Sequence, residues 1–448
     1  MASPTAAVMW FRRDLRLGDN PALLEACSDG AVLPLFVVDD ALWRPSGSPR
    51  RVYLAASLRA LDESLRELSG RLVLTHGDPV SRVVAAAREV DARRVHIAAD
   101  YGPYGARRDE AAERALAEHD IELVRTGSPY AVAPGRVRNQ EGNAYRVYTP
   151  FSKAWAAHGW RGPVDAPRHS TWLEMSRSAQ LPDPGLRAEM ELPEAGEQAA
   201  RRRWREFFDS SVDDYAADRD RPDLDATSRL SVHLKWGEIH PRTLLADLGR
   251  KRSKGAETFR KELAWREFYA DVLFHRPDSA RDYLRSEFAR MDYDDPGEQL
   301  QAWKDGRTGY PIVDAGMRQL ARTGWMHNRV RMIVASFLVK DLHVEWQHGA
   351  RHFMEHLVDG DLASNQHGWQ WVAGCGTDAA PYFRIFNPTT QGRRFDPDGD
   401  YVRRWVPELA DVADPHEPGQ VAGYPAPIVD HATERDESLA RYERIRAT

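Results

Sequence analysis

Short apolar runs alternate with longer, helically patterned stretches in the first part of the chain. The apolar runs cover residues 7–11, 32–38, 72–75, 95–98 and 121–124. Between them, apolar residues recur at helical spacing over 50–68, 79–90 and 106–119, which predicts amphipathic helices. Strands that alternate with helices indicate βαβ units, so we expect an α/β domain with a doubly wound parallel sheet over residues 1–127.

The pattern changes twice after this domain. Residues 128–196 are rich in Pro, Gly and Ser with isolated aromatic residues, which indicates a long interdomain linker. From residue 197 the apolar spacing is helical, most clearly over 257–274, 311–322 and 329–342. We therefore expect an all-α domain over 197–448 that the linker joins to the α/β domain.

Composition narrows the class of protein. The chain has 448 residues, 42% of them hydrophobic and 29% charged, as in globular proteins. It has no uncharged apolar run near the roughly 18 residues of a membrane span, no export signal and only two cysteines, Cys27 and Cys375. We expect a cytoplasmic protein with no membrane partner. Its net charge of −6 means that a DNA partner would require a local basic patch.

One short motif could hold a metal. His352, Glu355 and His356 spell HxxEH, a pattern that places two imidazoles and a carboxylate on one helix face and can bind a catalytic zinc. No further ligand can be named, and a solvated helix face is the simpler interpretation. We expect no metal and keep a zinc metallopeptidase as a rival hypothesis. The α/β domain carries neither GxGxxG nor GxxxxGK[ST], so its fold alone assigns no ligand.

Carboxylates, an amide and indoles are concentrated between residues 359 and 371. They are Asp359, Asp361, Asn365, Trp369 and Trp371. Asn328, Arg331 and Met332 fall at i, i+3 and i+4, so they share one helix face. A carboxylate near Arg331 can form a charge-assisted pair that orients a polar heterocycle. Helix capping and aromatic packing remain an alternative interpretation of the same residues.

Two further segments have the residue types of nucleic-acid sites. Glu262, Trp265 and Tyr269 lie at i, i+3 and i+7, where an indole could stack on a flipped base and a carboxyl could bind its edge. An amphipathic helix that buries both aromatic rings is the alternative. The Arg-rich segment 384–395 could bind phosphates or form a solvated surface.

Longer motifs occur in a fixed order along the chain. They are WFRRDLR at 10–16, TSRLS at 227–231, WREFY at 265–269, TGYPIVDA at 308–315, GWMHNRVRM at 324–332, DGD at 359–361 and FNPTTQG at 386–392. With these motifs the chain resembles the DNA photolyase/cryptochrome family over nearly its whole length, most closely the class I photolyases that repair cyclobutane pyrimidine dimers (CPDs).

The resemblance implies an FAD cofactor inside the helical domain. The phosphates of FAD would be bound by Tyr215, Thr227, Ser228, Arg229, Leu230 and Ser231. Asp359 and Asp361 would meet the isoalloxazine and ribose, with Arg331 as the charge partner of Asp359. Asn365 would face flavin N5, where an amide tolerates both protonation states.

The resemblance also implies a monomer that acts on UV-damaged DNA containing pyrimidine dimers. Excited reduced FAD would donate an electron to a flipped-out dimer, so that neither a metal nor a general base is needed. The residues that match the dimer cavity are Glu262, Trp265, Asn328, Arg329, Met332 and Trp371, with Asn365 on the flavin side. Those that match DNA contacts are Arg219, Trp265, Asn328, Arg329 and Gln391.

Two positions depart from the family pattern. Trp369 and Trp346 match the first two members of the aromatic chain that reduces the flavin, but Tyr293 replaces the third tryptophan and must lose a proton when oxidised. The segment 101–109 lacks the acid that partners a folate antenna. We therefore expect 8-hydroxy-5-deazaflavin as the antenna chromophore rather than methenyltetrahydrofolate.

Two other types of protein in the family share most of these motifs. A (6-4) photolyase would carry a second histidine after His327, where this chain has Asn328. A cryptochrome-type blue-light receptor is the alternative of a different class, and such receptors often carry a long C-terminal extension. Because the chain ends soon after the family core and retains Glu262 and the Asn328 and Arg329 pair, we expect DNA repair.

Overall fold

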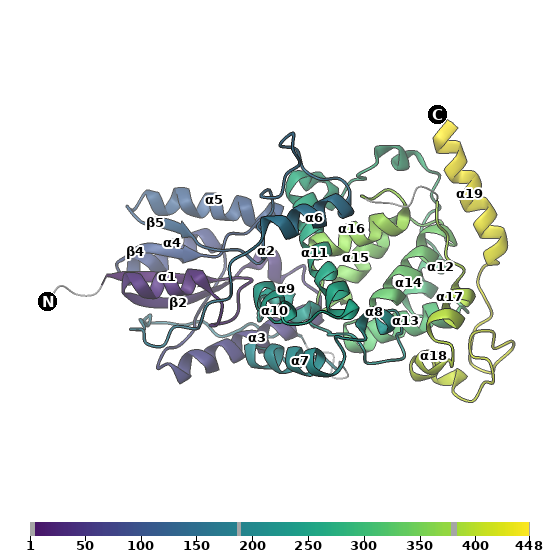
Figure 1. The fold of residues 1–448 in the computed structure, drawn as a ribbon, viewed down its shortest axis with the longest axis horizontal. Helices are drawn as coiled ribbons and strands as arrows, with labels where there is room; N and C mark the ends of the chain where they lie inside the picture. The colour runs from purple at the N-terminus through teal and green to yellow at the C-terminus, as the bar shows by residue number, and fades with distance from the viewer. Residues whose placement is uncertain (1–4, 186–189, 378–382, 448) are drawn as a thin grey trace.

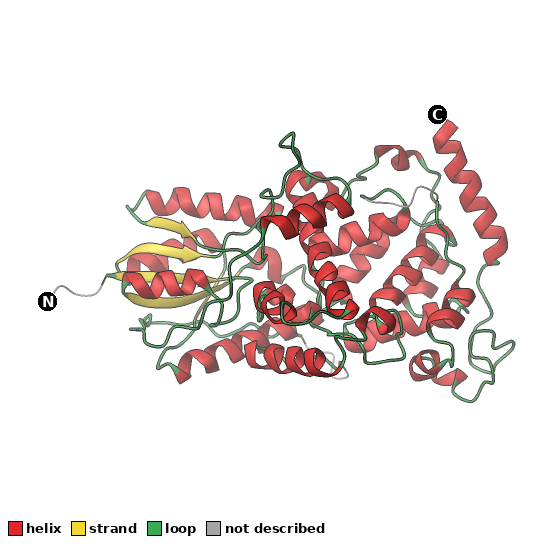
Figure 2. Ribbon diagram, viewed as in Figure 1, coloured by secondary structure: helices red, strands yellow, loops and turns green. Residues whose placement is uncertain are grey.

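The computed structural model of the chain describes residues 5–185, 190–377 and 383–447. A parallel sheet covered by helices forms one end, and a larger helical part forms the other (Figure 1). Figure 2 shows that the strands are confined to the first of these ends. This arrangement confirms the expected fold class.

The sheet has five parallel strands in the order β3-β2-β1-β4-β5. Their bounds are β1 Ala6–Phe11, β2 Ala31–Val38, β3 Val73–His76, β4 Ala92–Ile97 and β5 Glu122–Arg125. The central pair is in register with Val8 opposite Leu33, and every residue of β2 is buried. Continuous apolar strands of this kind are typical of a sheet covered on both faces. Because the strand order reverses between β1 and β4, their carboxyl ends form a topological switch point.

The helices of the sheet domain are α1 Pro21–Asp29, α2 Asp40–Trp43, α3 Ser48–Glu67, α4 Pro79–Glu89 and α5 Pro103–Ala117. The last three confirm the predicted helices within a few residues. Sequence analysis missed α1, which buries only Ala22, Leu23 and Ala26 and so shows little periodicity. The Asn20 side chain caps this helix by accepting a hydrogen bond from the Leu23 amide.

The segment between the sheet and the helical part contains a helix that the sequence pattern did not indicate. Helix α6, Tyr148–His158, buries Tyr148, Phe151 and Trp155. The Trp155 indole donates a hydrogen bond of 2.6 Å to Glu267 of helix α11, which fixes α6 against the helical part. Isolated aromatic residues among Pro and Gly gave no readable period, and the packing against α11 supplies the stability of this helix.

The remaining helices build the helical part. Their bounds are α7 Glu197–Ser210, α8 Tyr215–Asp218, α9 Ser231–Trp236, α10 Pro241–Leu248, α11 Lys254–His275, α12 Glu298–Lys304, α13 Pro311–Thr323, α14 Asn328–Lys340, α15 Trp346–His356, α16 Leu362–Ala373, α17 Pro388–Phe395, α18 Asp400–Trp405 and α19 His431–Ala447, with 3-10 turns at η1 Pro277–Ala280, η2 Ser286–Arg290 and η3 Pro407–Leu409. Helices α11, α13 and α14 confirm the three clearest sequence predictions. Helix α14 packs against α13, α15 and α16, and their shared core contains fully buried Trp303, Phe337 and Trp346.

Ion pairs join the sheet domain to the helical part. Arg13, which follows β1, lies 2.7 Å from Asp361 at the start of α16. Arg242 of α10 lies 2.8 Å from Asp19 on the sheet side, and both side chains are almost fully buried. Arg13 of the WFRRDLR motif therefore joins the end of β1 to the start of helix α16.

Candidate functional site

A cavity lies between helices α14, α15 and α16, which run together in the helical part (Figure 1). Its lining comprises Asn328, Arg331, Met332, Ala335, Phe353, Leu357, Asp359, Gly360, Asp361, Ser364, Asn365, Gly368, Trp369 and Val372. The helical face predicted for Asn328, Arg331 and Met332 points into this cavity. Residues expected to hold the cofactor and residues expected to meet the substrate thus share one enclosure.

Arg331 and Asp359 form the predicted charge pair. The guanidinium donates to Asp359 Oδ2 at 2.8 Å and also to the carbonyl of Met326, which fixes its orientation. The Asp359 side chain is only 2% exposed, and its Oδ1 atom is buried with no hydrogen-bond partner among the described residues. A buried carboxylate oxygen without a partner is costly, so this atom favours a ligand that presents an N–H or O–H group.

Asp361 begins helix α16 as its cap. Its carboxylate accepts a hydrogen bond from the Ser364 amide and lies 2.7 Å from Arg13. Burial opposes ionisation of this carboxyl, but the charges of Arg13, Lys235 and Arg266 outweigh it and lower the pKa of Asp361. The aspartate is therefore an anion that both caps the helix and binds the sheet domain.

Asn365 and Gly368 lie one turn apart on α16 and line the cavity. The Asn365 amide donates to the Ala350 carbonyl at 3.0 Å and to Gln366 Oε1 at 2.7 Å. Since both N–H groups are engaged, the amide oxygen is the group left to accept a hydrogen bond from a ligand. A Cβ atom added to Gly368 would meet nothing within 4 Å, so this side of the helix leaves room for a ring.

The predicted phosphate-binding residues lie outside this cavity lining. The loop formed by Thr227, Ser228, Arg229, Leu230 and Ser231 leads into α9, and Arg203 donates to the carbonyls of Thr227 and Ser228 at 2.7 and 3.0 Å. Tyr215 is buried against Phe207 and Phe259. Helix α9, which follows the loop, packs next to the Asp359 segment, because Val232 and Val358 belong to one buried cluster.

Glu262 of α11 is paired with Arg219, which follows α8. Arg219 Nη1 donates to Glu262 Oε1 at 2.5 Å. Burial raises the pKa of Glu262 above its ordinary value, although the Arg219 charge opposes the shift. The sequence prediction gave these residues separate roles, and the structure places them in direct contact.

Trp265 stacks face to face on Tyr148 of α6. Their ring centroids are 3.7 Å apart and the planes differ by 6°. Tyr269, one turn further along α11, stacks on His367 of α16. Sequence analysis missed Tyr148, because a stack across 117 residues leaves no periodic signal.

The remaining predicted DNA contacts also have partners within the protein. Arg329 donates to Asp220 at 2.7 Å, and its guanidinium lies 4.4 Å from the centre of the Phe395 ring. Gln391 is half-buried on α17, a helix that packs against α14. Trp371 is half-buried beneath the guanidinium of Arg384, whose carbon lies 5.9 Å from the indole centre.

The two predicted electron-transfer tryptophans are buried between α15 and α16. Trp369 is 3% exposed and lines the cavity, and its six-membered ring packs against Gly349 of α15. Trp346 is fully buried one turn before Gly349. Tyr293 is half-buried and stacks at 6.4 Å on Tyr283, a residue that the motif comparison alone would not have placed there.

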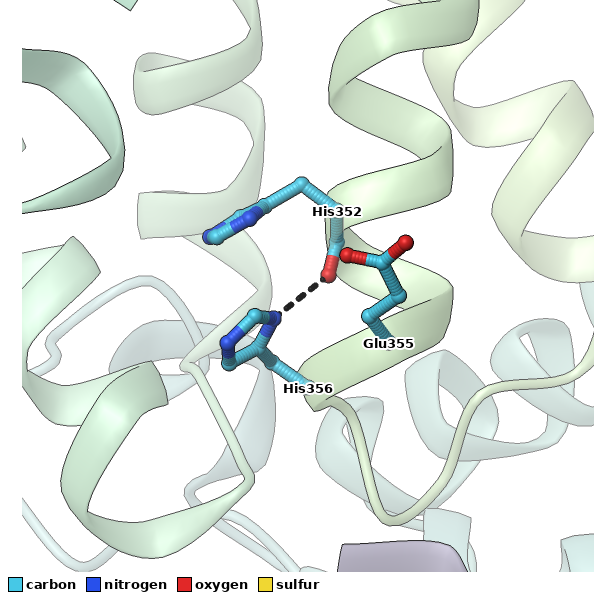
Figure 3. Close-up of side chains that lie close together, drawn as sticks. All are labelled: His352, Glu355 and His356. Atoms are coloured by element: carbon cyan, nitrogen blue, oxygen red, sulfur yellow. Dashed lines mark hydrogen bonds between the residues drawn. The ribbon is translucent and has the colours of Figure 1, made fainter. Parts of the chain in front are cut away.

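The HxxEH residues come together away from the cavity. Figure 3 shows the rings of His352 and His356 beside one another, with centroids 4.2 Å apart. The possible ligand atoms of these two residues and Glu355 all lie within 4.8 Å of one another. His356 Nδ1 hydrogen-bonds to the His352 carbonyl, which leaves Nε2 as the ring atom that could bind a metal. The three side chains therefore form one cluster on α15.

The segment predicted to hold the antenna lies at the switch point of the sheet. Tyr104 donates to Asp39 at 2.5 Å, and Arg108 and Arg12 both bind Asp109 at 2.8 Å. A Cβ atom on Gly105 would lie 2.1 Å from the Asp100 carboxylate. A larger residue at position 105 would therefore require the Asp100 side chain to move.

Comparison with known proteins agrees with this geometry. A DNA photolyase model matches residues 7–169, and a model of the FAD binding domain of DNA photolyase matches residues 259–444. The chain belongs to the DNA photolyase family. It is 44% identical to a deoxyribodipyrimidine photo-lyase of Streptomyces griseus over 99% of both chains.

Solved photolyase-family structures have the same fold. A class III photolyase from Agrobacterium tumefaciens superposes with a TM-score of 0.94 at 37% identity, covering 100% of this chain and 99% of that one. A cryptochrome from Synechocystis superposes with a TM-score of 0.90 at 26% identity, covering 98% and 99%. Within the described residues, none of the helices is long and apolar enough to cross a membrane.

The photolyase FAD-binding domain includes the whole cavity. The unpartnered Asp359 oxygen, the free accepting oxygen of Asn365 and the open space beside Gly368 fit a flat heterocycle with N–H groups. The residues present therefore fit the flavin ring that the family binds.

Proposed function

We propose that this protein repairs cyclobutane pyrimidine dimers in DNA by light-driven electron transfer. The observation that carries the proposal is that one cavity is lined both by Asn328 and Met332 and by Asp359, Asn365 and Trp369. An electron donor and a substrate that share one cavity lie close together, which favours direct electron transfer between them. The close relatives named deoxyribodipyrimidine photo-lyase support the same reaction.

Bound FAD supplies the light-excited electron for splitting the cyclobutane ring. Asp359 would orient the flavin by accepting a hydrogen bond at Oδ1, while Arg331 holds the carboxylate in place. Asn365 would accept a hydrogen bond from an N–H group of the flavin through its amide oxygen. Tyr215 and the loop 227–231 would bind the phosphate end of the cofactor.

Glu262 and Arg219 act together on the dimer side. In the free protein, Arg219 stabilises the ionised Glu262 carboxylate. A DNA phosphate competes for Arg219 when the duplex binds, and Glu262 then loses its cation in a partly buried position whose desolvation already raises its pKa. The carboxyl takes up a proton and can donate a hydrogen bond to a thymine carbonyl on which negative charge develops.

Aromatic rings and arginines form the rest of the DNA side. The stacked pair of Trp265 and Tyr148 forms a rigid wall for the flipped bases, and Trp371 forms a second wall. Arg329 exchanges Asp220 for a phosphate, and Gln391 contacts the backbone beside it. These partners keep the arginines ordered before DNA binds, which reduces the entropy lost in the complex.

Substitution of Glu262 tests this arrangement. Glu262→Gln keeps a hydrogen-bond donor at all pH values and should retain most of the repair yield per photon. Glu262→Ala removes the donor and should slow ring splitting by about tenfold, the effect of roughly one charge-assisted hydrogen bond. Both variants are measured as chemically reduced protein on a dimer-bearing oligonucleotide. Equal yields from wild type and Glu262→Ala would remove the role of Glu262.

We also infer that different segments of the chain have different functions. Residues 1–127 bind an antenna chromophore at the switch point of the sheet, residues 128–196 link the two parts, and residues 197–448 bind FAD and DNA. For the antenna we propose 8-hydroxy-5-deazaflavin, because the segment 101–109 lacks the acid that partners a folate antenna in the family. Reconstitution with each chromophore in turn tests this: tight uptake of methenyltetrahydrofolate without deazaflavin would contradict it.

A further inference from the structure

A pair of stacked tyrosines connects buried Trp346 to the protein surface. The Tyr283 ring meets the Trp346 indole edge to face, with centroids 6.1 Å apart. Tyr293 stacks on the other side of Tyr283 at 6.4 Å, and the two phenol hydroxyls are hydrogen-bonded to each other. The exposed fraction of these residues increases from Trp346 at 0% to Tyr283 at 9%, and Tyr293 is half-buried.

The two tryptophans at the inner end have no means of releasing a proton. Trp369 Nε1 and Trp346 Nε1 are buried, and neither has a hydrogen-bond acceptor within the described residues. An oxidised indole that keeps its N–H proton remains a radical cation, which is a strong oxidant. An electron vacancy on Trp346 is therefore not trapped there and can be filled by a neighbouring ring.

Tyr283 has the proton acceptor that the tryptophans lack. Its hydroxyl donates to Glu345 Oε1 at 2.7 Å. Glu345 immediately precedes Trp346 and occupies the N-terminal cap position of α15, so its carboxylate lies beside the residue that is to be refilled. Glu345 is thus the base for the Tyr283 proton, and the next residue, Trp346, is the oxidant that takes the electron.

The segment that carries Tyr283 is held firmly in place. The Leu284 amide donates to Gln370 Oε1 at 2.9 Å, and the Arg285 amide donates to the Cys375 carbonyl at 3.1 Å. Both anchors belong to the helix and turn that also carry Trp369. Helix α16, which carries Trp369, therefore also fixes the position of Tyr283 relative to the tryptophans.

The other aromatic neighbour of Trp369 does not offer an equivalent exit. Trp303 meets Trp369 at 6.2 Å, but it is fully buried and donates its indole N–H to the Val334 carbonyl. Its further aromatic neighbours are His352 at 5.4 Å and Phe353 at 6.3 Å, and imidazole and benzene rings are much harder to oxidise than phenol or indole. Along this branch the described residues therefore offer no outward path for a vacancy on Trp303.

We infer that Tyr283 is the residue that refills Trp346 during light-driven reduction of the flavin, and that Glu345 accepts its proton. This inference rests on the proposed function, with the photo-excited oxidised flavin as the primary oxidant of Trp369. One electron passes from Tyr283 to the Trp346 radical cation, and the hydroxyl proton passes to the Glu345 carboxylate. A neutral tyrosyl radical and a neutral Glu345 result.

Tyr293 then completes the path. It transfers a hydrogen atom through the shared hydroxyl contact to the Tyr283 radical, which becomes a normal phenol again. The radical now lies on the half-buried ring, where a thiol in solution can reduce it. Tyr283 is thus a required intermediate, and Tyr293 is the outermost donor.

Light-induced radicals in the FAD-loaded protein test the inference. Electron paramagnetic resonance, with ring-deuterated tyrosine to identify the radical, should show a neutral tyrosyl radical in the wild type. Tyr293→Phe should confine it to Tyr283. Tyr283→Phe should replace it with a tryptophan radical cation and slow flavin reduction by about tenfold or more, since the next donor is lost.

Glu345→Gln tests the proton acceptor separately. It keeps a side chain of the same size that can still accept a hydrogen bond from Tyr283, but the amide cannot take the proton. Tyrosyl formation should be about tenfold slower, corresponding to roughly one charge-assisted bond, and should respond less to D2O than in the wild type. Asp292→Asn, an exposed change beside Tyr293, is the matched control and should behave as the wild type.

Three results would overturn the inference. They are an unchanged tyrosyl signal in Tyr283→Phe, a Glu345→Gln rate and D2O response equal to those of the wild type, and the absence of any tyrosyl radical in the wild type. Dimer repair is also measured with the same proteins after chemical reduction of the flavin. This assay does not depend on Tyr283 or Glu345, so it tests the proposed function independently of the inference. A wild type that forms the tyrosyl radical but repairs no dimers would refute the proposed function alone.

Discussion

Asp359→Asn removes the charge opposite Arg331 while keeping the size of the side chain. The Asp359 side chain is 2% exposed, so water cannot replace the hydrogen bonds that its carboxylate makes. The Arg331 side chain is 25% exposed and can still be solvated when its partner loses the charge. A hydrogen bond to a charged group contributes about 1.5–3 kcal/mol, and a neutral amide keeps part of it. With about 1.4 kcal/mol for each factor of ten, FAD should bind roughly 10- to 100-fold more weakly.

The affinity is measured by stripping the flavin and titrating FAD back, following the quenching of its fluorescence. Urea unfolding of the same apoprotein shows whether the fold is intact. Asp411→Asn, at an exposed position, is the control with the same chemical change. If Asp359→Asn binds FAD as tightly as the control, Oδ1 has no partner in the cofactor, and the assignment of this cavity to the flavin ring is wrong.

Three further changes test other parts of the site. Arg329→Ala should weaken binding to any DNA and lower the salt dependence by about one phosphate contact, which a salt series of binding isotherms would reveal. Trp369→Phe should severely slow flavin photoreduction while leaving repair by pre-reduced protein nearly intact; equal rates in both assays would exclude it from the chain. Gly349→Ala would place a Cβ 2.1 Å from Trp369 Cη2, and should lower the free energy of unfolding by about 1–3 kcal/mol in urea titrations.

Features that depend on local spacing could be predicted from the sequence. The strands of the sheet and helices α11, α13 and α14 follow from periodic apolar residues, and the shared face of Asn328, Arg331 and Met332 follows from helical spacing. The pairing of Arg331 with Asp359 was also predicted, because the family resemblance placed both at the flavin. Short helices such as α1, in which few residues are buried, gave too weak a pattern.

Contacts between distant segments could not be predicted in this way. Tyr148 and Trp265 stack across an interface between α6 and α11 that only the folded chain defines. Tyr283 and Glu345 are 62 residues apart, and their hydrogen bond depends on how the segment between η1 and η2 lies against the start of α15. The position of Gly105 beside the Asp100 side chain is likewise a property of the folded chain.

The central claim is light-dependent repair, and one measurement tests it most directly. Chemically reduced, FAD-loaded protein is mixed with an oligonucleotide that contains a single thymine dimer, and recovery of the two thymines is followed under blue light and in the dark. The account predicts recovery that requires light and reaches many dimers per protein molecule. Recovery that is equal in light and dark, or absent in both, would contradict it.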